Sequence, residues 1–288
     1  MKKRVSHIAT SQKGPVFLVA EFEKKAYSWN LDTYERISEF DTVLDYGGFR
    51  LAITEDGKQC VAAAYNRYGL AMYDVSTGSI VWSRKDIKGT QYIKFDPANE
   101  KIYVGFYKKP MLVIDRNDGS DIERIRSAEQ VYFDYISSKR FFLKDENKVV
   151  GDGIEVESPA FTFFDAQPTK TGAALCADDL IYYDLSEQKI TWRVTPGAKE
   201  HFLKLAYSIE KDVIFALLYK YDEPRTSPYY LLYRISADDG AVKYTFPLPL
   251  ESFEFGFAQD AAKLICSSGE LFDISSSEPK LIHKFVWF

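Results

Sequence analysis

The histidines and cysteines of this chain, residue types often used for metal binding and catalysis, are few and widely spaced. His7, His201 and His283 lack the H-x-x-x-H or H-E-x-x-H spacing that brings two imidazoles onto one helix face. The three cysteines form no C-x-x-C pair, so their spacing predicts neither a zinc site nor a disulfide framework. We expect buried thiols, no bound metal ion and no catalytic histidine.

Adjacent carboxylates are the remaining candidates for acid–base catalysis. The sequence has two such pairs, Asp178–Asp179 and Asp238–Asp239. Neighbouring side chains on a strand point to opposite faces, and aspartate is common in turns, so we expect neither pair to form a catalytic dyad. The G-x-S-x-G, P-loop and G-x-G-x-x-G motifs do not occur in the sequence. The sequence therefore predicts no catalytic residue and no cofactor.

The composition is that of a globular, slightly acidic chain rich in aromatic residues. The 288 residues include 37 Lys and Arg and 42 Asp and Glu, which gives a net charge of −5 and argues against nucleic acid or an anionic membrane as a partner. The longest apolar run, residues 213–219, has the length of a strand, and no apolar segment follows the basic N-terminus. We therefore predict no membrane helix, no signal peptide and a cytoplasmic location. The 20 Tyr, 21 Phe and 4 Trp residues favour β-strands.

A ten-residue motif recurs along the chain. Residues 73–82 (YDVSTGSIVW) return as residues 183–192 (YDLSEQKITW), and in both the tryptophan comes eight residues after the aspartate. Weaker copies lie near residues 30, 115, 234 and 273, and the long interval from 115 to 184 leaves room for a degenerate unit at 131–159. The pattern indicates seven units of about 41 residues each.

Each unit is predicted to contain four short strands. In the second unit these are residues 50–54, 60–65, 70–75 and 79–83, with an Asp-Gly turn after the first. Turn signals every 8–12 residues also suit a β-sandwich, but a repeat of about 41 residues with four strands is typical of a β-propeller. We predict one all-β domain, a seven-bladed β-propeller of four-stranded antiparallel blades. The predicted blades cover residues 1–41, 42–86, 87–127, 128–159, 160–198, 199–250 and 251–288.

The recurring motif has a structural meaning. Asp74 and Thr77 can accept and donate hydrogen bonds in the turn between the third and fourth strands, and Gly78 suits a left-handed position there. Trp82 can then lie flat against the neighbouring blade. With these residues the chain resembles the quinoprotein-like (tryptophan-docking) β-propeller repeats and, more loosely, WD-repeat proteins, although the fifth unit has Gln188 in place of the glycine. In that family the motif is structural, so the resemblance implies a fold and no catalytic or cofactor-binding residue.

The two ends of the chain are expected to meet at the closure of the ring. The first recognisable strand is residues 4–9 and the last is residues 281–288. If the first and last units each supply their own four strands, no strand is exchanged across the closure. The aromatic segment Phe285–Phe288 would then hold the ring closed by apolar packing.

The connections between second and third strands are predicted to form a binding face. In a propeller they all emerge on the same side, and here they are rich in tyrosine and basic residues, which are frequent in interface hot spots. The connection at residues 219–230 is the longest, and insertions in repeats tend to lie on the functional face. The alternative interpretation is that the lysines only increase solubility and the tyrosines pack on the next blade. The predicted partner-binding residues are Tyr65, Arg67, Tyr68, Tyr107, Lys108, Lys109, Tyr221 and Arg225.

These features predict a non-catalytic protein-binding propeller. The expected partner is another protein with an acidic surface, which the basic loops would attract, and binding of nucleic acid is not expected. The chain would act as a partner-specific inhibitor, for example of the toxin-immunity type, or as an assembly scaffold. The alternative is a metal-dependent hydrolase of the lactonase type, in which carboxylates from different blades meet in the central channel.

Overall fold

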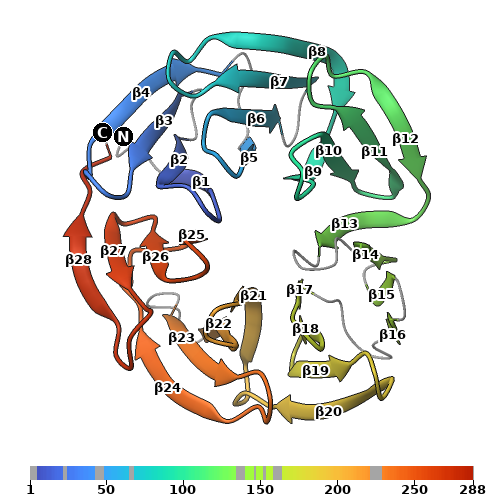
Figure 1. Cartoon of the computed structure of the whole chain (residues 1–288), viewed down its shortest axis with the longest axis vertical. Coiled ribbons are helices and arrows are strands. Elements are labelled where there is room, and N and C mark those ends of the chain that lie inside the picture. The colour runs from blue at the N-terminus through green and yellow to red at the C-terminus, as the bar shows by residue number, and fades with distance from the viewer. Residues whose placement is uncertain are drawn as a thin grey trace.

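Seven four-stranded antiparallel sheets surround a common axis, which confirms the predicted all-β, seven-bladed β-propeller (Figure 1). The computed structural model describes residues 5–21, 25–42, 49–64, 68–133, 140–145, 147–151, 154–157, 164–220 and 229–287. Each sheet is built from four strands that are consecutive in the sequence. We number the sheets as blades 1 to 7 in chain order.

Within each blade the strands follow one another from the axis to the rim (Figure 1). Blade 1 contains β1 (Val5–Thr10), β2 (Val16–Glu21), β3 (Lys25–Asn30) and β4 (Arg36–Asp41), and blade 2 contains β5 (Phe49–Ile53), β6 (Gln59–Ala64), β7 (Tyr68–Asp74) and β8 (Ile80–Lys88). Blade 3 contains β9 (Thr90–Phe95), β10 (Lys101–Phe106), β11 (Lys109–Asp115) and β12 (Asp121–Ile125), and blade 4 contains β13 (Ala128–Phe133), β14 (Arg140–Lys144), β15 (Lys148–Gly151) and β16 (Ile154–Glu157). Blade 5 contains β17 (Asp165–Pro168), β18 (Gly172–Cys176), β19 (Leu180–Asp184) and β20 (Lys189–Val194), and blade 6 contains β21 (Glu200–Ser208), β22 (Val213–Lys220), β23 (Tyr229–Ser236) and β24 (Val242–Pro247). Blade 7 contains β25 (Phe255–Ala258), β26 (Lys263–Cys266), β27 (Glu270–Asp273) and β28 (Lys280–Lys284).

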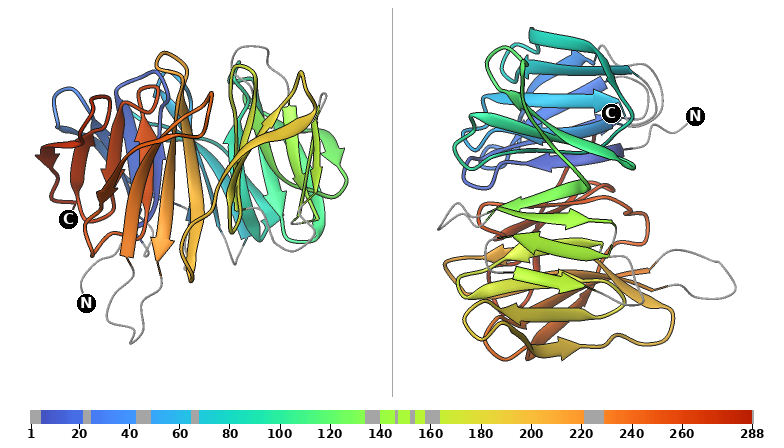
Figure 2. Two further views of the ribbon diagram at one scale, coloured as in Figure 1. Left: turned by 90° about the horizontal axis from the view of Figure 1, so that it is seen from below. Right: turned by 90° about the vertical axis from the view of Figure 1, so that its right-hand side faces the viewer.

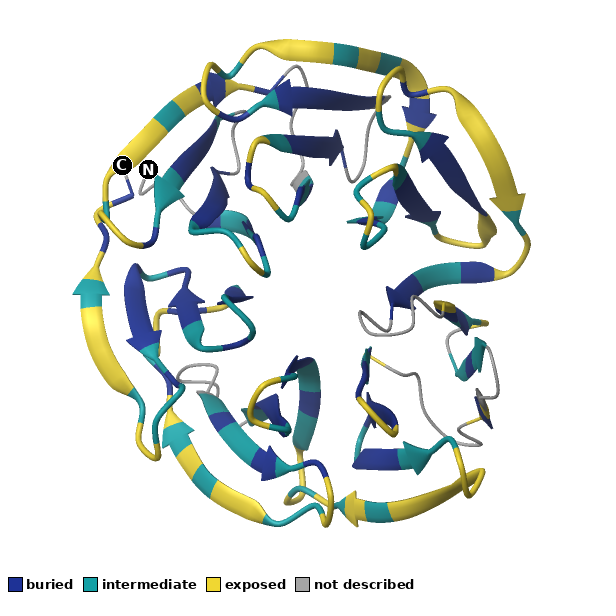
Figure 3. Ribbon diagram, in the orientation of Figure 1, coloured by how far each residue is buried: buried dark blue, intermediate teal, exposed yellow. Residues whose placement is uncertain are grey.

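Burial falls from the middle of each blade toward its outer edge (Figure 3). The second strand β2 (VFLVAE) is buried along its whole length, because both of its faces pack against neighbouring blades. The fourth strand β24 (VKYTFP) instead alternates between exposed and half-buried residues, because only one of its faces meets protein. The apolar second strands and mixed fourth strands of the sequence are therefore explained by their distance from the axis.

The propeller has two faces that differ in the connections they carry. Because adjacent strands are antiparallel, the turns that join first to second strands and third to fourth strands lie on one face, which we call the turn face. The connections from second to third strands and the links between blades lie on the other, which we call the loop face. The β5–β6 turn (residues 54–58) lies on the turn face, and residues 107–108 and 126–127 lie on the loop face.

The recurring motif joins each of its two blades to the next. In the turn between β7 and β8, Asp74 accepts hydrogen bonds from the backbone N–H groups of Ser76 (3.0 Å) and Thr77 (2.9 Å), and Gly78 has a φ of +69°. The indole of Trp82 reaches blade 3, where its Nε1 donates a hydrogen bond to the Arg116 carbonyl at 2.7 Å. The predicted contact between this tryptophan and the neighbouring blade is confirmed.

The second copy of the motif repeats this geometry. Trp192 of blade 5 donates a hydrogen bond to the Ala237 carbonyl of blade 6 at 2.9 Å, and its ring lies over Gly240. In this copy Gln188, which replaces the motif glycine, takes a φ of +53°. The left-handed turn position is therefore kept even where the sequence has no glycine to favour it.

The ring closes by side-chain packing and isolated hydrogen bonds, without exchange of a strand. Blades 1 and 7 each contain their own four strands, and the Thr10 hydroxyl of β1 donates a hydrogen bond to the Phe257 carbonyl of β25. After β28, Phe285 and Trp287 stack on each other (5.0 Å between ring centres) and pack edge-on against Phe17 and Trp29 of blade 1. The predicted closure by the aromatic segment is confirmed for these two residues, while Phe288 lies outside the described residues.

Individual strands differ in detail from the prediction. The outer strand of blade 2 continues to Lys88, beyond the predicted end at residue 83. The degenerate unit forms a complete four-stranded sheet, in which β15 has only four residues. The Gly-Asp-Gly sequence at residues 151–153 predicts a hairpin bend, but residues 152–153 lie outside the described chain. Among the described residues, no helix has the length and apolar character needed to cross a membrane.

Candidate functional site

Three of the predicted binding residues are neighbours on the loop face of blade 3. Tyr107 and Lys108 form the short connection between β10 and β11, and Lys109 begins β11. Lys108 has a φ of +52°, and its ammonium lies 4.9 Å from the centre of the Tyr107 ring. Tyr107 is 57% exposed, so it does not pack beneath a neighbouring blade as the alternative interpretation required.

The other predicted binding residues are not placed by the structure. Tyr65, Arg67, Tyr221 and Arg225 lie outside the described residues, and Tyr68 begins β7 without a description of its side chain. Their role in binding stays a prediction.

A groove lies beside these residues, between blades 3 and 4 on the loop face. It has a volume of about 590 Å³, and we call it the basic groove. Within the described chain, neither Lys109 nor Arg126 has an ion pair, and both side chains are exposed. The groove therefore offers two exposed cations, next to Lys108, to an anionic group from outside. Its lining residues are Lys108, Lys109, Pro110, Arg126, Ser127, Glu129 and Asp145.

The links between blades add residues to the loop face that are not among the predicted binding residues. Arg126 belongs to the link between β12 and β13, and Phe164, Leu250 and Phe253 are exposed in other links. These links emerge on the same face as the second-to-third connections because both follow from the antiparallel order of the strands. The antiparallel strand order, from which the loop face was predicted, therefore also predicts that residues of these links lie on that face.

The three histidines lie on different strands and do not form a common site. His7 is on β1, His201 on β21 and His283 on β28. His201 Nδ1 lies 3.0 Å from Asp178 Oδ1, and the His283 ring stacks on the Tyr34 ring at 4.4 Å. Among the described residues, no three His, Cys, Asp or Glu side chains are arranged to hold a metal ion. All three cysteines are free and buried, as predicted.

The adjacent aspartates are held by separate partners. Asp178 contacts His201, whereas the Asp179 carboxylate forms an ion pair with Arg193 at 3.1 Å. In the second pair, Asp239 accepts a hydrogen bond from the backbone N–H of Ala241 at 3.0 Å, as expected of a turn residue. Neither arrangement brings the two neighbouring carboxylates together on one reacting atom.

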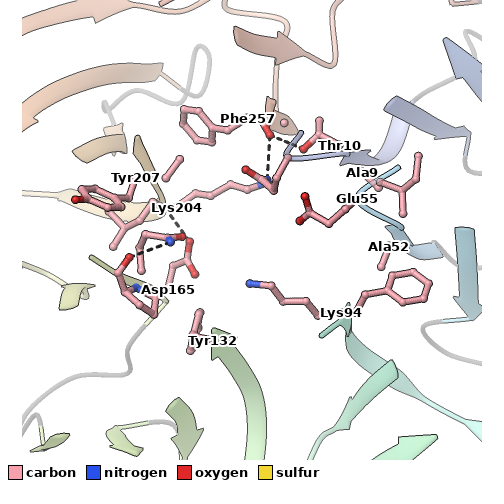
Figure 4. A pocket seen from close by; sticks show the side chains of 18 of the residues that line it. Ala9, Thr10, Ala52, Glu55, Lys94, Tyr132, Asp165, Lys204, Tyr207 and Phe257 are labelled. Carbon is pink, nitrogen blue, oxygen red and sulfur yellow. Dashed lines mark hydrogen bonds between the residues drawn. The ribbon is translucent and has the colours of Figure 1, made fainter. Parts of the chain in front are cut away.

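Besides the basic groove, the structure has a cavity of about 580 Å³ in the central channel (Figure 4). Lys94 of β9 and Glu55 of the β5–β6 turn point from one side into its centre, and Asp165 of β17 lines the other side. The Lys94 ammonium lies 5.7 Å from the centre of the Tyr132 ring. Asp165 accepts hydrogen bonds from the backbone N–H groups of Leu205 (2.8 Å) and Ala166 (2.9 Å).

Burial dominates the electrostatics of the channel carboxyls. It raises the pKa of Glu55 above its ordinary value, against the opposing effect of Lys13 and Lys94. It also raises the pKa of Asp165, against the backbone hydrogen bond from Leu205 and the charges of Lys94 and Lys204. Both carboxyls therefore hold their protons more tightly than exposed carboxyls do.

Comparison with known proteins supports the propeller fold. No protein-family model matches the chain, and no curated protein sequence matches it. Among solved structures, the chain is similar to the β-propeller domain of Myceliophteria thermophila Cps50 (Swd1), with a TM-score of 0.72 and 8% identity over 97% of this chain and 96% of that one. This likeness agrees with the seven-bladed β-propeller fold of the described strands. Membership of the quinoprotein-like repeat family, which the motif resembles, is not confirmed.

Proposed function

We propose that this chain is a non-catalytic protein-binding propeller that holds an acidic segment of one partner on its loop face. The observation that carries the proposal is the basic groove, in which Lys108, Lys109 and Arg126 converge beside the exposed Tyr107. Tyrosine and arginine combine a large contact area with fixed hydrogen-bond geometry. Lys109 and Arg126, which have no ion pair within the described chain, favour an anionic partner.

The charge of the whole chain makes this local arrangement more selective. The chain has a net charge of −5, so its charge as a whole does not attract an acidic protein. An acidic partner is then attracted only where the cations are concentrated, and its orientation is set as it approaches. This argues for a single defined docking orientation on the loop face.

Two modes of action are consistent with such a surface. In the first, the propeller is an inhibitor of the toxin-immunity type that covers the active site of its partner. In the second, it is a scaffold that joins a larger assembly. The two are separated by the partner's own activity, which falls on binding in the first mode and is unchanged in the second.

A pull-down from the native cell with the tagged chain tests the proposal. The bait is compared with the double variant Lys108→Glu/Lys109→Glu, and mass spectrometry identifies what each retains at low and high salt. We expect one stoichiometric partner for the natural chain and at least a tenfold loss for the variant, because two attractions become repulsions. High salt should also weaken the natural complex.

A matched variant controls for the change in overall charge. Lys85→Glu/Lys243→Glu alters the net charge equally, but both positions are exposed on the outer strands β8 and β24. It should retain the partner, and both variants should melt within about 2 °C of the natural chain, since surface substitutions change stability little. If the groove variant kept its partner, or both variants lost it equally, the proposed face would be wrong.

A further inference from the structure

The basic groove contains exposed charges of both signs, and they come from two neighbouring blades. Lys109 begins β11 of blade 3, and Arg126 lies in the link from blade 3 to blade 4. Asp145 lies in the connection between β14 and β15 of blade 4. All three residues line the same groove of about 590 Å³. The groove is therefore not uniformly basic, because blade 4 contributes a carboxylate to it.

These three charges are not neutralised within the described chain. Lys109, Arg126 and Asp145 are exposed, and none of them has an ion pair among the described residues. Lys148 of β15, the first lysine after Asp145 in the sequence, forms an ion pair with Glu155 instead. Opposite charges that line one groove without pairing remain available to charges of a binding partner.

The charge pattern of the groove restricts what can bind there. Lys108 and Glu129, which also line it, already have interactions within the chain. A segment with only acidic residues gains from Lys109 and Arg126, but it is repelled by Asp145. A segment that also carries a basic residue compensates all three exposed charges. Charge complementarity therefore favours a segment of mixed charge over a purely acidic one.

We propose that the partner segment bound in the basic groove carries charges of both signs. Its acidic residues meet Lys109 and Arg126, and a lysine or arginine of the same segment meets the Asp145 carboxylate. This inference rests on the proposed protein-binding function and specifies the chemistry of the partner. Because the cations and the carboxylate come from different parts of the groove, the order of charges in the segment also fixes its direction across the groove. Asp145 is thus a specificity-determining residue that discriminates against purely acidic segments.

The direction of the effect of Asp145→Asn tests the proposal. Asp145 has a φ of +51°, and asparagine tolerates this left-handed conformation, so the variant should fold as the natural chain does. The substitution makes the groove more positive, so a purely acidic segment would bind more tightly, whereas a segment of mixed charge loses an attraction. The pull-down from the native cell is repeated over a range of bait concentrations. We expect the partner to bind Asp145→Asn at least threefold more weakly, and Asp145→Lys, which replaces the attraction by a repulsion, at least tenfold more weakly.

Matched variants separate this effect from that of overall charge. Glu35→Gln and Glu35→Lys change the net charge by the same amounts, but Glu35 is exposed in the β3–β4 turn on the turn face, so both should bind the partner as the natural chain does. Asp145→Asn should melt within about 2 °C of the natural chain. Unchanged or tighter binding by Asp145→Asn, or equal weakening by Glu35→Gln, would overturn this inference and leave the proposed function intact. Absence of a partner, or its retention by Lys108→Glu/Lys109→Glu, would instead refute the binding face and this inference with it.

Discussion

Among single residues, His7 shows how packing inside the propeller changes the pKa of a side chain. It lies on the first strand, its Nδ1 is shielded from solvent, and its pKa is lowered to about 3. Burial, which disfavours the imidazolium ion, is the largest cause; the charges of Lys204 and Arg50 add to it, and a hydrogen bond with the Leu51 backbone opposes it. None of these neighbours is close to His7 in the sequence, so the chain alone could not reveal the effect.

The lowered pKa of His7 predicts a loss of stability in acid. In the unfolded chain this imidazole takes up a proton near pH 6.5, whereas in the folded chain it does so only near pH 3. Its effect on stability is therefore absent above pH 6.5, and the folded state loses stability as the pH falls from 6.5 toward 3. Both proteins are unfolded in urea at pH 7.5 and at pH 4.5. Between these two values, the free energy of unfolding of His7→Gln should fall by about 2 kcal/mol less than that of the natural chain. Equal losses in the two proteins would contradict the prediction.

Between elements, the tryptophan contacts show how the motif joins one blade to the next. The Trp82 ring of β8 lies over Gly119 in the β11–β12 turn, where the backbone has a φ of +73°. A Cβ atom built at Gly119 would lie 2.8 Å from the ring. Glycine is needed at this position both for its conformation and for the space that the tryptophan occupies.

The substitution Gly119→Ala tests the contact between blades 2 and 3. It should lower the free energy of unfolding by about 2–3 kcal/mol, because it adds a left-handed alanine and a steric clash. In a Trp82→Ala background the same substitution should cost only about 1 kcal/mol, since the clash is gone and the backbone strain remains. Urea unfolding of the four proteins measures the difference. Additive effects would show that the two residues do not interact.

The repeat period was enough to predict the seven-bladed architecture. The groove and the channel could not be predicted in this way, because they depend on how the blades pack in three dimensions. The spacing of Asp74 and Trp82 predicted both a turn and a contact with the next blade, because these depend on neighbours within one or two units. The basic groove combines Lys108 with Arg126, and the channel combines Glu55 with Lys94 and Asp165. Such residues become neighbours only when the blades are stacked and the ring is closed, so no local pattern marks them.

On the scale of the whole molecule, stability depends on the closure between blades 7 and 1. Phe285 and Trp287 are buried there against blade 1, whereas the intervening Val286 is 79% exposed. Phe285→Ala and Trp287→Ala should each lower the free energy of unfolding by about 3 kcal/mol, as expected for large buried aromatic residues. Val286→Ala should change it by less than about 0.5 kcal/mol. Chemical unfolding measures all three, and equal effects would show that the segment does not hold the ring closed.

The same closure determines how the molecule responds to mechanical tension. Inside a blade, adjacent strands are joined by ladders of backbone hydrogen bonds. Across the closure, the described residues are joined by side-chain packing, by the Lys263–Asp32 ion pair and by isolated hydrogen bonds, such as the one from the Asp260 N–H to the Gln12 carbonyl. No ladder of backbone hydrogen bonds joins their strands there. A force that pulls Val5 and Trp287 apart therefore breaks the contacts between blades 7 and 1 first. The ring would open into a curved row of intact blades before any blade loses a strand.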